Sequence, residues 1–148
     1  MTETVILPPA RQRRGGSFVP PLLVFPFLVY NALAFLAYGG NAQGWDNGIL
    51  TVPMVSGTPW VITSGDLLLA VSLVLLFIEI LKSTRSGSAS ILEHMLSMVV
   101  FVVYLVEFLL AGAAATSVFF LLMAMSLIDV IAGFTVSITS AGRDVTMN

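Results

Sequence analysis

The chain has 148 residues, of which 57% are hydrophobic and 9% are charged, whereas soluble domains carry roughly 25% charged residues. This composition indicates an integral membrane protein. The net charge of -2 leaves no basic face for nucleic acid, and the lack of cysteine excludes disulfides, thiolate chemistry and cysteine-ligated metal centres. We expect one transmembrane domain over residues 17–140, with a flexible cytoplasmic tail at 1–16 and another tail at 141–148.

The first predicted membrane-spanning helix covers residues 18–38. A helix needs about 20 mostly apolar residues to cross a bilayer, and this run has that length. Pro20 and Pro21 suit a first helical turn, where the missing N–H group costs little. Pro26 lies inside the run and is predicted to kink the helix. The run exceeds the apolar core of a usual signal peptide, so we expect it to be retained.

The connection at residues 39–64 is the one sizeable non-helical segment that we expect. Residues 46–48 are a turn signal, and Ile49–Val55 has the composition of a strand that a following Ser-Gly pair turns back. Two interpretations are open: a hairpin that acts as a lid or docking element, or a connector that lies on the lipid headgroups. Trp45 and Trp60 favour the second, because tryptophan is enriched at membrane interfaces.

Three further spans are predicted at residues 65–82, 91–113 and 117–138. Two capping boxes mark helix starts, Thr63 with Asp66 and Ser90 with Glu93. The short connection between the last two spans predicts an antiparallel helical hairpin.

The basic residues predict the orientation of these spans. With four spans, all six basic residues fall on one side of the membrane, which the positive-inside rule assigns to the cytoplasm. They are Arg11, Arg13, Arg14, Lys82, Arg85 and Arg143. The sequence therefore predicts an all-α membrane protein, an antiparallel bundle of four transmembrane helices with both termini in the cytoplasm. Its expected location is a bacterial inner membrane.

Polar and small residues follow one face of each of the last three helices. The residues are Gly65, Ser72, Glu79 and Ser83; Glu93, Ser97, Val100, Tyr104, Glu107, Ala111 and Ala114; and Ser126, Asp129, Ala132 and Gly133. Steps of three, four and seven place such residues on a common helical face. Small residues allow close helix approach and polar ones form hydrogen bonds between helices, so we expect the three faces to meet.

The carboxylates on these faces are the main functional candidates, because an ionisable residue at membrane depth is costly. A rise of about 1.5 Å per residue spaces Glu79, Asp129, Tyr104 and Glu107 at depths about 5–6 Å apart, with Asn31 near Glu107. One hypothesis is a proton or cation path along this series. The other is that the carboxyl groups are protonated and join the helices through hydrogen bonds.

His94 is the only histidine and is expected near the cytoplasmic end of its helix. A zinc site needs three or four ligands, so one histidine with scattered carboxylates argues against a metal, and we expect no cofactor. A membrane enzyme that acts on lipid through His94 and Glu93 is the least favoured hypothesis.

The favoured hypothesis is a non-enzymatic accessory or scaffold protein, because the chain lacks a nucleophile–base constellation. Its expected partners are the lipid bilayer and either further copies of itself or a larger membrane complex. The alternative is a small proton- or cation-coupled transporter or channel that uses Asp129 and Glu107.

Overall fold

The computed structural model describes residues 20–84 and 88–145, including all side chains except those of residues 88–91, 137 and 140–145. The tail expected at 1–16 and five of the six basic side chains therefore lie outside the described parts. The helix start predicted at Ser90 is wrong, because the helix Ser88–Leu110 already includes this residue. The expected tail at 141–148 is partly helical, because the last helix continues to Val145.

The described chain is mostly helical. In chain order its elements are α1 (Val24–Ala32), the π-helix η1 (Leu33–Ala37), the 3-10 helix η2 (Ala42–Asp46), β1 (Gly48–Pro53), β2 (Pro59–Thr63), α2 (Ser64–Ser83), α3 (Ser88–Leu110), the 3-10 turn η3 (Gly112–Ala114) and α4 (Ser117–Val145). Three segments are long and apolar enough to cross a membrane: Ser64–Ser83, Leu92–Leu110 and Ser117–Val136. The protein is thus a multi-pass membrane protein.

The first helix is shorter than predicted, and its proline has a different role. The apolar helix covers Val24–Ala37, so it begins several residues after residue 18. Pro26 consequently lies in the first turn of α1 and does not kink the interior of a helix. A first turn tolerates proline because its N–H groups have no partner within the helix.

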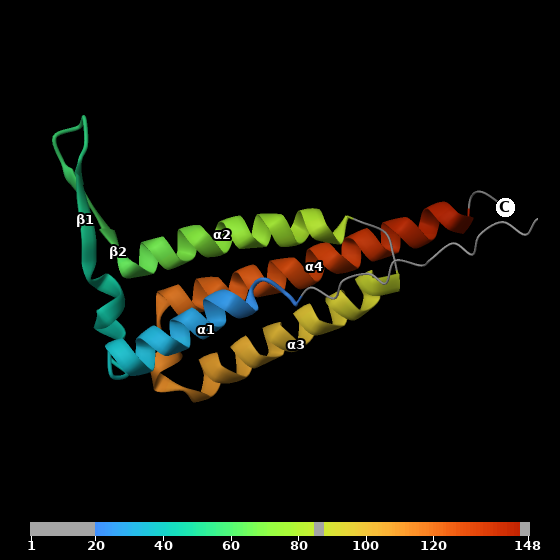
Figure 1. Ribbon diagram of the computed structural model, residues 1–148, viewed down its shortest axis with the longest axis horizontal. Coiled ribbons are helices and arrows are strands. Elements are labelled where there is room, and N and C mark those ends of the chain that lie inside the picture. The colour runs from blue at the N-terminus through green and yellow to red at the C-terminus, as the bar shows by residue number, and fades with distance from the viewer. Residues whose placement is uncertain (1–19, 85–87, 146–148) are drawn as a thin grey trace, which may run out of the picture.

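The four main helices lie side by side and alternate in direction (Figure 1). α4 packs along both α2 and α3, while α1 lies beside α4 and contacts α2 and α4. α1 and α3 run toward the end that carries the strands, here called the hairpin end, and α2 and α4 run away from it. α4 is therefore the element on which the other helices assemble.

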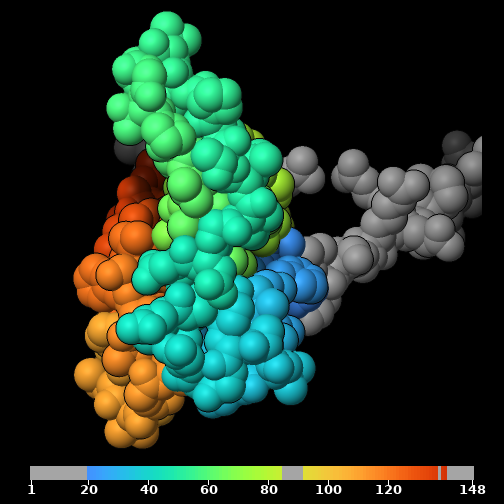
Figure 2. All heavy atoms as spheres, turned by 90° about the vertical axis from the view of Figure 1, so that its left-hand side faces the viewer, coloured from blue at the N-terminus to red at the C-terminus, as the bar shows by residue number. Residues whose placement is uncertain are grey.

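The connection before α2 contains two antiparallel strands, so the described chain is not purely helical. Leu50 pairs with Ile62 and Val52 with Trp60, and the register shifts between Gly48 and Leu50. The hairpin projects sideways from the bundle, as Figures 1 and 2 show. β2 leads directly into α2, which starts with the predicted capping box: the Thr63 side chain accepts a hydrogen bond from the Asp66 N–H, and the Asp66 carboxylate accepts one from the Thr63 N–H.

Aromatic side chains close the hairpin end of the bundle. The rings of Tyr30 and Trp45 stack with centroids 4.4 Å apart, and Phe119 meets the Tyr30 ring edge-on. Tyr38 packs edge-on against the other side of Trp45. Trp45 is only 2% exposed, so it fills the interior of the protein and does not join Trp60 in an exposed belt.

Candidate functional site

The predicted polar faces of the last three helices are turned inward. Gly65, Ser72, Glu79 and Ser83 are all buried on α2. The buried members on the other helices are Ser97, Tyr104, Ala114, Ser126, Asp129 and Gly133. Because α4 packs against both α2 and α3, these faces meet as the sequence predicted. These inward faces carry the polar side chains that form the candidate site within the bundle.

Glu79 links three elements near the end of the bundle opposite the hairpin. Glu79 is buried, with 3% of its surface exposed. One carboxylate oxygen, Oε1, lies 2.9 Å from Lys82 Nζ, one turn further along α2. The other, Oε2, accepts a hydrogen bond of 3.0 Å from the backbone N–H of Leu22, in the turn before α1. Lys82 Nζ also lies 3.8 Å from Glu93 Oε2 on α3, so these contacts join α2 to α3 and to the turn that precedes α1.

Asp129 belongs to the same end of the bundle. It is buried on α4, and the Ser97 side chain of α3 forms a hydrogen bond with its carboxyl group. Glu79, Lys82 and His94 are all close enough to Asp129 to act on it electrostatically. We call Glu79, Lys82, Glu93, His94, Ser97 and Asp129 the charged cluster.

His94 packs tightly against α4, one turn beyond Asp129. A Cβ atom added to Gly133 would collide with the His94 ring, so the glycine makes room for the imidazole. Close approach of this kind is what small residues at helix contacts allow. In the described part of the chain, no three histidine, aspartate or glutamate side chains are grouped so that they could hold a metal ion.

Tyr104 and Glu79 hold the two ends of one short backbone segment. Tyr104 is fully buried on α3, and its hydroxyl donates a hydrogen bond of 3.0 Å to the carbonyl of Leu23. The neighbouring N–H of Leu22 donates to Glu79, as described above. In the turn that precedes α1, a backbone N–H group is therefore bound by a side chain of α2, and the next backbone carbonyl is bound by a side chain of α3. We call this pair of contacts the turn clamp.

Glu107 lies apart from the charged cluster. It is partly exposed on α3, and its Oε2 accepts a hydrogen bond of 3.2 Å from Asn31 Nδ2. Asn31 Nδ2 also donates to the carbonyl of Phe27, one turn earlier in α1. Among the described residues, the side-chain hydrogen bonds of Tyr104, Asn31 and Glu107 end on α1 or on one another, and none reaches Asp129. The predicted series thus divides into two groups.

Tyr30 makes the contact that joins α1 to the connection between α3 and α4. Its hydroxyl donates a 2.7 Å hydrogen bond to the carbonyl of Ala113 and lies 2.7 Å from Thr116 Oγ1. Sequence analysis did not select Tyr30, although a polar aromatic residue in the middle of an apolar run was a signal that could have identified it. The backbone groups of Leu22 and Leu23 carried no sequence signal of this kind.

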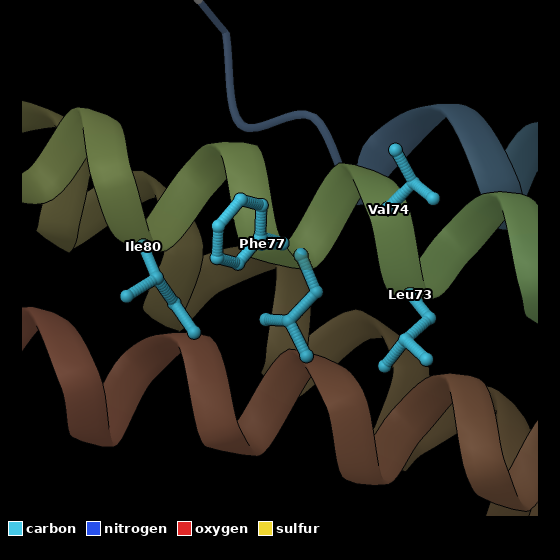
Figure 3. A pocket seen from close by; sticks show the side chains of 5 residues that line it. Leu73, Val74, Phe77 and Ile80 are labelled. Carbon is cyan, nitrogen blue, oxygen red and sulfur yellow. The ribbon is translucent and has the colours of Figure 1, made fainter.

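A hollow on the surface of α2 has an entirely apolar lining. Its volume is about 420 Å³, and it is lined by Leu73, Val74, Leu76, Phe77 and Ile80 of α2. Figure 3 shows Leu73, Phe77 and Ile80 along α2, above the ribbon of α4. All of these side chains are apolar, as expected for a surface that faces lipid or another apolar helix.

The chain matches no known protein-family model, no curated protein and no solved structure.

The turn clamp predicts that Tyr104→Phe destabilises the protein. The variant removes a buried hydrogen bond to the carbonyl of Leu23, and a hydrogen bond of this kind contributes about 0.5–1.5 kcal/mol to stability. Tyr38→Phe is the matched control, because the Tyr38 hydroxyl makes no hydrogen bond within the described residues. Thermal unfolding in detergent should show a lower midpoint for Tyr104→Phe than for Tyr38→Phe. Equal midpoints would contradict the clamp.

Proposed function

We propose that this protein is a non-enzymatic accessory or scaffold component of a bacterial inner membrane, acting as a homo-oligomer or as a subunit of a larger membrane complex. The observation that carries this proposal is the internal pairing of its polar side chains. Glu79, Tyr104, Glu107 and Asp129 all bind groups on neighbouring elements of the same chain. Side chains used in this way fix helix positions and are not presented to a substrate.

The outward surface supports the same proposal. Large apolar side chains cover the outside of the helices, for example Leu73 and Phe77 on α2 and Ile131 on α4. The apolar hollows of about 420 and 290 Å³ beside α2 have no titratable side chain in their linings, whereas a small-molecule site usually combines an apolar lining with a few converging polar groups. Such a surface suits lipid and the apolar helices of partner proteins.

In the proposed topology, α1 and η1 supply a fourth crossing and both termini are cytoplasmic. The contacts of the first helix support this arrangement. Leu22 binds Glu79, one turn before the end of α2, while Tyr38 packs against Trp45 at the hairpin end. Residues 22–38 thus extend along most of the length of α2. Lys82, at the end opposite the hairpin, is on the side that the positive-inside rule assigns to the cytoplasm.

The scaffold proposal predicts a defined assembly. Purification in a mild detergent, followed by native mass spectrometry, should recover one oligomeric size or the same partner proteins in each preparation. A chain that stays monomeric and without partners, in detergent and after reconstitution into lipid nanodiscs, would contradict the proposal.

The alternative function is proton- or cation-coupled transport, and the charged cluster is the observation that favours it. Asp129 is buried at membrane depth and is influenced by Glu79, Lys82 and His94. Intramembrane groups of this kind form proton relays in pumps and transporters.

The transport alternative predicts a proton or cation flux in proteoliposomes that Asp129→Asn abolishes while the protein remains assembled. Glu107→Gln is the matched control, because it makes the same carboxylate-to-amide change outside the charged cluster. Loss of flux in both variants would indicate a relay along the whole predicted series. A flux that neither variant changes, or no flux at all, would rule out the alternative.

A further inference from the structure

The β1–β2 hairpin is the described feature that the scaffold proposal does not explain. It extends sideways from the end of the bundle and does not cover the helix ends (Figures 1 and 2). Its side chains are nevertheless apolar and exposed: Leu50 is 57% and Trp60 52% exposed. An isolated two-stranded hairpin is only marginally stable in water, so the exposed apolar surface requires another environment.

The position of the hairpin relative to α2 sets its depth in a membrane. β2 ends at Thr63 and α2 starts at Ser64, so the base of the hairpin lies where the apolar span begins. The 20 residues of α2 extend over about 30 Å, the thickness of the hydrocarbon core, which places Ser64 at the boundary with the headgroups. Because the hairpin runs crosswise to α2, its whole length follows that boundary.

The residues of the hairpin suit the boundary with the headgroups, and its backbone cannot lie deeper in the hydrocarbon core. No charged residue occurs between Asn47 and Gly65, so nothing opposes contact with the ends of the acyl chains. A two-stranded sheet leaves unpaired N–H and C=O groups along both outer edges, and these groups cannot be buried in hydrocarbon. At the level of the headgroups they remain hydrated. Trp60 is also the residue type most enriched at this level.

One face of the hairpin is suited to rest on lipid. Side chains alternate along a strand, so the paired residues Leu50, Val52, Trp60 and Ile62 share one face, whereas Thr51 and its partner Val61 lie on the other. Near the base, Ile49 lines an apolar groove of about 290 Å³ together with Leu67 and Val71 of α2 and residues of α1. The apolar surface of α1 and α2 therefore reaches the base of the hairpin at Ile49.

We propose that the hairpin is an in-plane membrane anchor whose apolar face, Leu50, Val52, Trp60 and Ile62, lies on the boundary between headgroups and acyl chains of the adjacent leaflet. The anchor would limit the tilt of the bundle relative to the membrane normal and hold α2 at a constant depth. It requires only that α2 crosses the bilayer, so it is independent of the scaffold and transport proposals.

The two tryptophans allow a direct test in the full-length protein reconstituted into phosphatidylcholine liposomes. The emission of Trp60 is the difference between wild type and Trp60→Phe, because Trp45 is buried and remains in both. The quenchers are lipids brominated near the carbonyl end or near the methyl end of their acyl chains, and iodide on both sides of the membrane. We expect bromine near the carbonyl end to quench Trp60 most and iodide to quench it weakly.

Strong iodide quenching with no effect of brominated lipid would overturn the anchor and place the hairpin in water. A second result would also overturn the anchor: Trp60 is shielded from all quenchers, and this shielding disappears when the protein is diluted with excess lipid. Such a result would indicate that the hairpin docks on a second copy of the chain.

A charged substitution on each face tests which side contacts lipid. Leu50→Asp should raise iodide quenching of Trp60 several-fold, because the carboxylate expels the apolar face from the boundary. Thr51→Asp is the matched control on the opposite face and should change quenching little. Unchanged Trp45 emission shows that the bundle is intact in both variants. Equal effects of the two substitutions would contradict the assigned face.

Discussion

The structure depends on one constraint: a polar group at membrane depth has to find its partner inside the protein, because the hydrocarbon supplies none. Glu79 shows how the chain meets this constraint. Its two carboxylate oxygens bind Lys82 on the same helix and the Leu22 N–H on another element. A charge that would be costly in lipid is thus compensated, and the same contact holds the start of α1.

The remaining helix arrangement follows from such pairings. α1 is short and lies on the bundle through few contacts, so the turn clamp at one end and Tyr30 at the other determine its position. The two ends of the bundle use different chemistry. One contains the charged cluster, and the other is closed by the stacked rings of Tyr30 and Trp45. Internal pairing leaves the outer surface of the helices apolar, which is the basis of the scaffold proposal.

Sequence periodicity predicted the helix faces well because α2, α3 and α4 are regular over their apolar spans. The burial of Ser72, Glu79 and Asp129 on inward faces confirms that interpretation. The membrane depth of each residue, calculated from its position along a straight helix, was a weaker guide to which side chains lie close together. The predicted spacing of Glu79 and Asp129 stays a prediction, because their electrostatic interaction sets no distance and rise per residue contains no information on how helices shift past one another.

Local signals also failed where tertiary contacts decide the outcome. Pro26 was expected inside a helix, but the helix starts close to it. Trp45 has the composition signal of an interfacial residue, but stacking on Tyr30 places it in the interior. The hairpin turn was recognisable from its residues, while the sideways direction of the hairpin depends on how η2 and α2 fix its two ends.

The central claim is that polar contacts within the bundle hold α1 in place. Hydrogen–deuterium exchange of Glu79→Ala in lipid nanodiscs tests this claim most directly, because the substitution removes the acceptor of the Leu22 N–H. We expect faster exchange in peptides from residues 22–37, with α3 and α4 as protected as in wild type. Unchanged exchange across residues 22–37 would contradict it.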